Sequence, residues 1–429
     1  MKNELPVSLS AVKSNSLLWG FLSSVLACLS SIIWRFKRVV VAAIVLCHCA
    51  ASAFFGLIFV VYPAAILIRP FHRPLFYQAA RVLFGGYWLS CLMFTEWMNF
   101  TAIRLSGEVP KSGENVLLIL NHKCNIDSMY IWSAIARVEL GAVGLFKAVV
   151  KSSIKYLPIY GWGMKTAGFI YISRSWEQDR AHIKRWAQAV VKDSLACWLT
   201  IYPEGTRFTE SAKKRSDEQM LKQGLQPYRT ELLMPRTSCA CCAATGLHFQ
   251  LCLLRRYWAT LAAQGTAVDM VQGMTQIIRS LDGYINTLCD MTIAYARKDG
   301  QLLSSTELGT QCLGRIFSGD SPVSTVHIHC AVHKVDELPE GDEQVAEWTQ
   351  DAWQRKDALL YTLARTGSFP GAIHQVALPF QVVALRFFVF MAMSWGGVYL
   401  LWTSSIFRWY TVFACLASML LAIADPPEW

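Results

Sequence analysis

The sequence predicts an α/β fold: a central domain with a mixed sheet flanked by helices, placed between N- and C-terminal transmembrane helices. Hydrophobic residues make up 54% of the chain and charged residues only 16%, which is more apolar than an ordinary soluble protein. Long uncharged runs lie near both ends, and short apolar runs alternate with amphipathic stretches between them, as in α/β domains. We therefore divide the chain into an N-terminal membrane-anchoring region (1–100), a central domain (101–375) and a C-terminal transmembrane region (376–429).

The N-terminal region contains two uncharged runs. Leu17–Trp34 is just long enough to span a bilayer, and Val39–Ile68 is longer than one untilted span requires. The basic tetrapeptide Arg35–Arg38 between them indicates the flank of an anchor rather than a signal-peptide cleavage site. Pro63 is expected to divide the second run into a helix and an interfacial tail. We expect this region to anchor the chain in a membrane.

Three further apolar stretches bear on the membrane topology. Val82–Phe94 is too short to span and is predicted to lie in the membrane interface. Near the C-terminus, Phe387–Phe407 is long enough for a spanning helix, whereas Trp409–Ala424 is marginal. The number of spans therefore stays open.

The middle of the chain carries the predicted strands and helices of the α/β domain. Apolar runs of strand length occur at Val116–Leu120, Phe169–Ile172, Trp198–Tyr202, Leu232–Met234, Met291–Tyr295 and Thr325–Val332. Amphipathic stretches predict helices at Ser128–Val138, Gln178–Val191 and Gln344–Leu360. The polar stretches follow directly after strands, which is where open α/β sheets place their ligands.

Charge and cysteine content narrow the class of partner. The net charge of +10 favours an anionic substrate or an anionic bilayer surface, and nucleic acid is excluded because no basic block or binding motif occurs. The 14 cysteines are too sparse for a disulfide scaffold, so we expect reduced, apolar fillers. We also expect no metal site, although two clusters suggest one at first sight: Cys239, Cys241 and Cys242, which lack a distal pair, and His327, His329 and His333, which lack carboxylates.

The stretch LILNHKCNIDSMYIW, Leu118–Trp132, places a histidine and an aspartate in one short loop. His122 can accept a proton from a hydroxyl group near neutral pH. A carboxylate on the other ring nitrogen, from Asp127, would fix the tautomer and stabilise the charged imidazole. The alternative is structural: Asp127 or Ser128 caps the following helix, and His122 is an ordinary loop residue.

A second stretch, WLTIYPEGTRFTE, ends an apolar strand in a polar turn at Trp198–Glu210. Gly205 lets the backbone approach a ligand closely, Thr206 offers a hydroxyl, and Arg207 offers a planar fork that matches phosphate oxygens. Taken alone, this turn is also consistent with a surface loop that carries a Glu–Arg pair.

Together, these motifs resemble the glycerophospholipid acyltransferases, in particular the eukaryotic membrane-bound 1-acylglycerol-3-phosphate acyltransferases. The resemblance covers most of Leu83–Leu360. It rests on the Asn-His-x4-Asp and Pro-Glu-Gly-Thr-Arg motifs and on further blocks in the same order: KSSIKYLPIYGWGM (151–164), GFIYISRSWEQD (168–179), LLMPRT (232–237), DMTIAY (290–295) and VAEWTQDAWQRKDALL (345–360).

The resemblance implies a reaction and a role for each motif residue. His122 would deprotonate the sn-2 hydroxyl of lysophosphatidic acid, which would attack the thioester of acyl-CoA and give phosphatidic acid. Asp127 would orient His122, and Pro235 would shape the acyl-donor side. The acceptor phosphate would be held by Arg174, Glu204, Gly205, Thr206 and Arg207. Acyl-CoA would be a co-substrate, and no cofactor or metal is expected because a thioester is already activated.

This chain departs from the family pattern in two places. The family usually has serine where this chain has Cys124, after Lys123, and an acyl-cysteine at Cys124 is a further, less favoured reading because no second base follows. After Thr237, an atypical insertion, Ser238–Gly265, replaces the usual Lys-Gly and helix. The insertion puts the proline-containing block in question.

Four alternatives remain open from the sequence. The acceptor is another lysophospholipid headgroup; the enzyme is a transacylase between phospholipids; the chain is an inactive membrane scaffold; or it is a metal-dependent phosphatase that uses His122 and Asp127 as ligands. The resemblance implies the endoplasmic reticulum as location. The oligomeric state and acyl-chain preference are left open.

Overall fold

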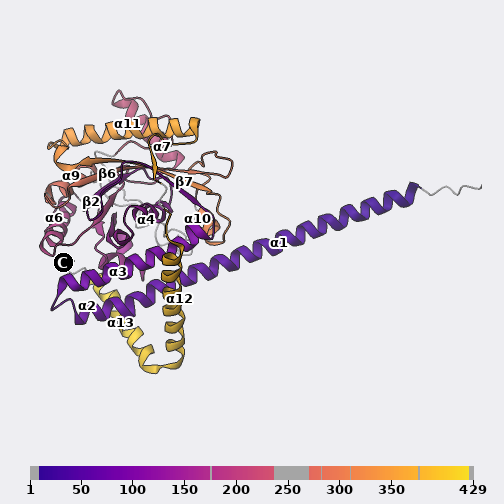
Figure 1. Cartoon of the computed structure of the whole chain (residues 1–429), viewed down its shortest axis with the longest axis horizontal. Coiled ribbons are helices and arrows are strands. Elements are labelled where there is room, and N and C mark those ends of the chain that lie inside the picture. Colours follow the sequence, from indigo (N-terminus) through magenta and orange to yellow (C-terminus); the bar gives the residue numbers. More distant parts are fainter. Residues whose placement is uncertain are drawn as a thin grey trace, which may run out of the picture.

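The computed structural model describes residues 9–173, 176–235, 270–281, 283–309, 311–374 and 377–424. Its centre is one eight-stranded sheet in the order β4-β3-β5-β2-β6-β7-β1-β8 (Figure 1). The strands are β1 (Ala102–Gly107), β2 (Val116–Leu120), β3 (Phe146–Lys151), β4 (Ile170–Ile172), β5 (Trp198–Ile201), β6 (Thr287–Ala296), β7 (Thr325–Lys334) and β8 (Ile373–His374).

The sheet is mixed, as the sequence predicts. Strands β4, β3, β5, β2 and β6 run parallel, and β7 then pairs antiparallel with β6. The edge continues with β1, parallel to β7, and β8, antiparallel to β1. Because β2 and β5 are parallel neighbours, the loops after them emerge at the same edge of the sheet.

Alternate side chains of β2 belong to two separate cores, which explains its uninterrupted apolar run. Val116, Leu118 and Leu120 pack with α3 (Arg73–Leu92) and α4 (Asp127–Val138). Leu117 and Ile119 face the other core, which is closed by three further helices: α6 (Trp176–Lys192), α9 (Met270–Ser280) and α11 (Asp342–Thr366). Figure 1 shows α11 and α3 on opposite faces of the sheet.

Five of the six predicted strands and all three predicted helices are confirmed to within a few residues. Leu232–Met234 was wrongly predicted as a strand, since its residues are buried in irregular structure and the Met234 amide bonds to Ser216 Oγ at 2.8 Å. Burial, rather than pairing, explains its apolar character. Strand β3 was missed because Lys147 and Lys151 interrupt its apolar pattern, and pairing with β4 and β5 determines its conformation.

The N-terminal helices differ from the two separate apolar segments that the sequence suggested. Helix α1 (Leu9–Gly56) is continuous through the basic tetrapeptide Arg35–Arg38, and it passes through a π-helical turn (Leu57–Val61) into α2 (Tyr62–Leu67). Pro63 does not end the helix, because it lies in the first turn of α2, where its missing N–H is tolerated. Figure 1 shows the first part of α1 extending away from the α/β body.

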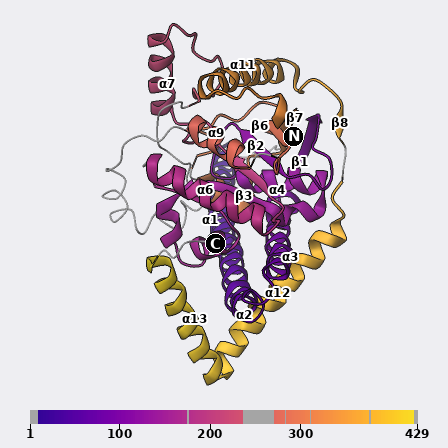
Figure 2. The ribbon, with the colours of Figure 1, turned by 90° about the vertical axis from the view of Figure 1, so that its left-hand side faces the viewer.

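Two further helices follow the α/β body. Helix α12 (Phe380–Thr403) and helix α13 (Ser405–Ala424) are separated at Ser404, so the predicted span Phe387–Phe407 was wrongly placed across that break. The two helices form a V below the body (Figure 2). In the part of the chain that is described, two helical stretches are long and apolar enough to cross a membrane, Ser24–Leu67 and Phe380–Thr403.

Candidate active site

His122 and Asp127 form a buried hydrogen-bonded pair directly after β2. Nδ1 of His122 donates to Oδ2 of Asp127 at 2.7 Å, and the two residues are 2% and 0% exposed. Nε2 of His122 is buried and has no hydrogen-bond partner among the described residues. An imidazole whose Nδ1–H is held by a carboxylate presents a lone pair at Nε2, so it can accept a proton from a substrate.

Asp127 does not act as the N-cap of the following helix, which was the structural alternative to a catalytic role. The N-cap of α4 is Ile126, and it has no side-chain cap. Instead, Oδ2 of Asp127 also accepts from the Cys124 amide at 3.0 Å, and Oδ1 accepts from the Cys124 thiol at 3.2 Å and from the Tyr295 hydroxyl. These bonds fix the carboxylate in front of the imidazole.

Strand β6 supports the loop that carries this pair. Strand β6 continues beyond the end of β2. The Asn121 side chain forms two hydrogen bonds with the backbone of Ile293 in this strand: Nδ2 donates to the Ile293 carbonyl at 3.1 Å, and Oδ1 accepts from the Ile293 amide at 2.8 Å. Tyr295 lies two residues further along the same strand. Asn121 therefore places His122 in register with β6.

The loop after β5 lies against the His122 loop. The amide of Phe208 donates to the His122 carbonyl at 2.9 Å, and the Tyr202 ring lies 4.1 Å, centre to centre, from the His122 ring. Nη1 of Arg207 donates to Asn125 Oδ1 at 2.7 Å, so its guanidinium is held between the two loops. Gly205 has a φ of +68°, which a residue with a side chain rarely adopts.

Glu204 points into the protein rather than out of this loop. It is 1% exposed, and its Oε1 accepts from Trp353 Nε1 at 3.2 Å. Burial raises the pKa of Glu204 to about 8, against the lowering effects of the Trp353 indole, the His122 amide and Lys356. Glu204 therefore carries a proton over much of the neutral range.

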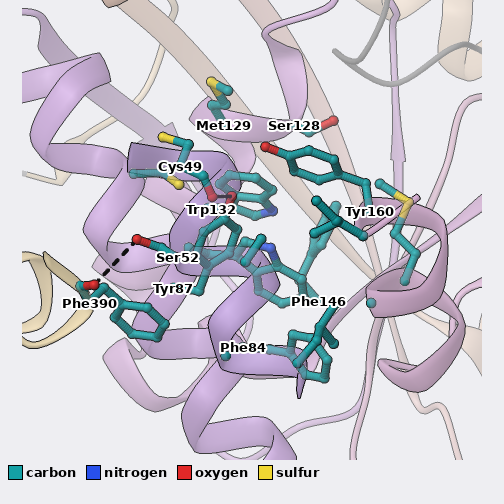
Figure 3. Close-up of a pocket in the computed structure, with 18 of the residues that line it drawn as sticks. Cys49, Ser52, Phe84, Tyr87, Ser128, Met129, Trp132, Phe146, Tyr160 and Phe390 are labelled. Atoms are coloured by element: carbon teal, nitrogen blue, oxygen red, sulfur yellow. Dashed lines mark hydrogen bonds between the residues drawn. The ribbon is translucent and has the colours of Figure 1, made fainter. Parts of the chain in front are cut away.

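An apolar cavity of about 160 Å³ adjoins the same loop. Asn125 and Ser128 are among its polar lining residues. The other lining residues come mainly from α1, α3, α4 and α12, with further residues from the π-helical turn, the start of β3, α5 (Tyr160–Thr166) and α10 (Gln311–Phe317); they include Cys49, Phe84, Trp132, Phe146 and Phe390. In Figure 3 the labelled side chains surround one space, with Ser128 drawn toward the top of the view and Phe84 toward the bottom. No Asp, Glu, Lys, Arg or His occurs among the described residues that line it. The cavity is suited to a hydrocarbon chain.

The predicted site residues are thus partly brought together. His122, Asp127, Glu204, Gly205, Thr206 and Arg207 lie in two adjacent loops at one edge of the sheet. Pro235 is buried at the end of the irregular segment that follows Leu232. Arg174 and the insertion Ser238–Gly265, which contains Cys239, Cys241 and Cys242, lie outside the described residues.

Other residues of the site had no role assigned from sequence. Tyr295 holds Asp127, Asn125 holds Arg207, and Trp353 bonds to Glu204. Tyr295 and Trp353 lie in the blocks DMTIAY and VAEWTQDAWQRKDALL, so the resemblance located them, but spacing alone does not reveal their partners.

A buried His–Asp pair at the edge of a mixed sheet, next to an apolar cavity, defines a site for base-assisted chemistry on an amphipathic substrate. Comparison with known families identifies the class. The model described as "Acyltransferase" matches residues 102–285, and the model described as "Acyltransferase C-terminus" matches residues 315–391. Together these segments cover more than half of the chain, and the chain belongs to this acyltransferase family.

Several curated proteins are similar along most of the chain. The 1-acyl-sn-glycerol-3-phosphate acyltransferase 2 of Brassica oleracea is 25% identical over 83% of this chain and 79% of its own length. The probable 1-acyl-sn-glycerol-3-phosphate acyltransferase 5 of Arabidopsis thaliana is 26% identical over 90% of both chains. Lysocardiolipin acyltransferase 1 of Mus musculus is 28% identical over 84% of this chain and 86% of its own length.

Proposed function

We propose that this protein is a membrane-bound acyltransferase that moves an acyl chain from acyl-CoA to the sn-2 hydroxyl of lysophosphatidic acid, giving phosphatidic acid. One observation carries the proposal: the free Nε2 of His122 lies in a loop whose neighbouring residues, Asn125 and Ser128, line an apolar cavity. A proton acceptor and a chain-sized apolar space are the two features that acylation of a lipid hydroxyl requires.

The chemical step uses His122 as general base. Nε2 accepts the proton of the acceptor hydroxyl while its oxygen attacks the thioester carbonyl, so the O–C bond forms and the C–S bond breaks. The proton then passes from the imidazolium to the departing CoA thiolate. Asp127 holds the tautomer and stabilises the imidazolium; a positioned base of this kind is worth roughly 10²–10⁴-fold in rate. The step requires no metal, because the thioester is already activated.

The acceptor phosphate binds at the loop after β5. Arg207 keeps donors free for two phosphate oxygens while Asn125 fixes its orientation. Thr206 adds a hydroxyl, and Gly205 allows the backbone to approach the ligand. Arg174 is the second arginine proposed for the phosphate, and Glu204 shapes the loop from inside.

The hydrocarbon part of a substrate enters the apolar cavity beneath the loop. Its walls are formed partly by α1 and α12, which contain the two stretches long enough to cross a bilayer. A chain can thus pass from lipid to the site without crossing water, which favours a membrane location. We propose the endoplasmic reticulum as that membrane, and Pro235 as a residue of the acyl-donor side.

The similarity to proteins named for 1-acyl-sn-glycerol-3-phosphate favours lysophosphatidic acid as acceptor. The proteins named lysocardiolipin acyltransferase favour a second candidate, a lysophospholipid whose phosphate is esterified within a larger headgroup. Arg207 accommodates either, because both acceptors present phosphate oxygens.

The test is transfer from labelled acyl-CoA to a panel of lysophospholipids, using membranes that contain the full chain. We expect lysophosphatidic acid to be the preferred acceptor and His122→Ala to remove transfer. His333→Ala is the matched control, because this half-buried histidine lies on β7, in edge-on contact with Trp348 and away from the loop. Preference for lysocardiolipin would change the acceptor and keep the mechanism. Absence of His122-dependent transfer to every acceptor would refute the proposed function.

A further inference from the structure

One face of α11 contacts three parts of the acceptor side. Trp353, Lys356 and Asp357 are spaced i, i+3 and i+4, so their side chains share one face of the helix. The three residues are buried, at 0%, 0% and 8% exposure, which is unusual for a lysine and an aspartate. They lie in the C-terminal family segment, outside residues 102–285 of the acyltransferase match. We call these three residues the α11 clamp.

The first contact is to the loop after β5. Nε1 of Trp353 donates to Oε1 of Glu204 at 3.2 Å. Oε2 of Glu204 is buried without a hydrogen-bond partner among the described side chains and backbone. A buried carboxyl group is costly unless it is hydrogen-bonded, so the Trp353 indole N–H, together with the His122 amide, determines where Glu204 can point. Glu204 directly precedes Gly205, Thr206 and Arg207.

The second contact fixes α11 to the sheet. Nζ of Lys356 forms an ion pair with Asp290 of β6 and donates to the Met291 carbonyl. The same ammonium group lies 5.0 Å from the centre of the Trp353 ring. Buried ion pairs add little net stability but impose one geometry, because each charge requires its partner. Lys356 therefore holds Trp353 at a defined position over β6.

The third contact reaches the segment before Pro235. Asp357 accepts hydrogen bonds from the Arg229 amide at 3.0 Å, the Thr230 amide at 2.8 Å and the Thr230 hydroxyl at 2.6 Å. The apolar residues Leu232–Pro235 follow at once. The same helix face thus secures both chain segments that approach the acceptor loop from this side.

From these contacts we infer that the α11 clamp is a positioning device for acceptor binding, in which Trp353 holds Glu204 and thereby sets the loop that presents Thr206 and Arg207 to the acceptor phosphate. In this role Trp353 and Lys356 act through Glu204 and Asp290. The inference rests on the proposed function for the role of the loop, and it assigns the C-terminal family segment a part in binding the acceptor.

The test compares two buried tryptophans. Trp353→Phe removes the N–H donor and keeps an aromatic ring. Trp186→Phe is the matched control, because Trp186 is 1% exposed in the same core, and its Nε1 donates to the Gly168 carbonyl at 2.9 Å, away from Glu204. For each full-length variant in membranes, KM for the lysophospholipid, KM for acyl-CoA, kcat and the unfolding temperature are measured.

We expect Trp353→Phe to raise KM for the lysophospholipid about tenfold, the size of one hydrogen bond to a carboxyl group, with kcat and KM for acyl-CoA changed less than about twofold. Trp186→Phe should lower the unfolding temperature similarly and leave both KM values unchanged. If the two variants have the same KM pattern, Trp353 has only a packing role and the inference is wrong.

A double-variant cycle tests the route through Glu204. In a Glu204→Met background, which removes the acceptor of the indole hydrogen bond, Trp353→Phe should no longer change KM for the lysophospholipid. An undiminished effect in that background would overturn the inference. If the unaltered protein transfers acyl chains to no lysophospholipid, the proposed function fails; if it does transfer and Trp353→Phe behaves as Trp186→Phe, only the clamp fails.

Discussion

The His122 loop and the apolar cavity meet at Asn125 and Ser128, but different forces determine their structures. In the loop, each polar atom has a particular partner: Asp127 accepts from the His122 ring, from Cys124 and from Tyr295. In the cavity, many mostly apolar side chains from several elements contribute surface, and none of the described lining residues is itself charged. Hydrogen bonds are directional, whereas apolar contact is roughly proportional to area.

The difference predicts how each region responds to substitution. Changing one atom in the loop removes a bond that nothing else replaces, so the rate should fall steeply. Changing one side chain in the cavity alters volume by a small fraction, so chain-length preference should shift while the rate is kept. Substitutions in the His122 loop and in the cavity test whether the two regions respond in these different ways.

The largest effect is expected for Asp127→Asn. The amide keeps the shape of the side chain but can donate to Nδ1 of His122, which favours the wrong tautomer, so kcat should fall on the order of 10²–10⁴-fold. Asp193→Asn is the control, because Asp193 is also nearly buried but pairs with Arg73 at 2.6 Å, away from the loop. A kcat for Asp127→Asn within about tenfold of the unaltered protein would show that His122 does not depend on this carboxylate.

A smaller effect, confined to the acceptor, is expected for Arg207→Lys. Lysine keeps the charge but loses the fork that bonds Asn125 and phosphate together, so KM for lysophosphatidic acid should rise about tenfold or more. KM for acyl-CoA should stay unchanged. Arg180→Lys, at an exposed arginine that bonds to Gln276, provides the comparison. An equal rise in both KM values would argue against a specific acceptor role.

In the cavity, Gly56→Ala is expected to change selectivity rather than rate. The added methyl group would meet Met393 Cε at 3.5 Å and Phe390 Cε1 at 3.9 Å, which are ordinary contacts, so the fold should be kept. In competition between acyl-CoA chain lengths, use of the longest chain should fall about two- to tenfold. Gly396→Ala, on α12 with nothing within 4 Å, should leave the ratio unchanged. An unchanged ratio in Gly56→Ala would place the chain elsewhere.

The smallest effect concerns stability and pH. The pKa of Glu204 is raised to about 8 in the folded protein, so its protonated form contributes stability that is present below the ordinary value of 4.5 and is lost as pH rises through about 8. Glu204→Gln removes this dependence. Between pH 5 and pH 8 the unfolding temperature of the unaltered protein should therefore fall by a few degrees relative to Glu204→Gln. A difference that does not vary with pH would contradict the raised pKa.

Local patterns were sufficient for much of the fold. The apolar run of β2, the mostly apolar run of β5 and the amphipathic pattern of α4 and α11 predict those elements, because each pattern reflects which faces of the element are buried. Strand β3 was missed, since its lysines are accommodated only by neighbouring strands. The continuity of α1 was not predicted, because the basic residues Arg35–Arg38 indicate a boundary between two segments. Charged side chains on an exposed helix surface do not end a helix, and α1 runs through them.

The site divides in the same way. Spacing within one loop brings His122 and Asp127 within reach, and the strand–turn pattern places Gly205 and Arg207 at the same sheet edge, so these residues were predictable from the sequence. Trp353 and Glu204 are 149 residues apart, and Tyr295 and Asp127 are 168 residues apart. The cavity requires α1 to pack against α12, where Ser52 bonds to Ser394, 342 residues away. Such contacts arise only when the sheet order and the helix packing are formed. The sequence by itself determined the reactive groups and the class of fold, whereas the tertiary structure decided what holds those groups and what space they adjoin, because long-range packing is a property of the whole chain.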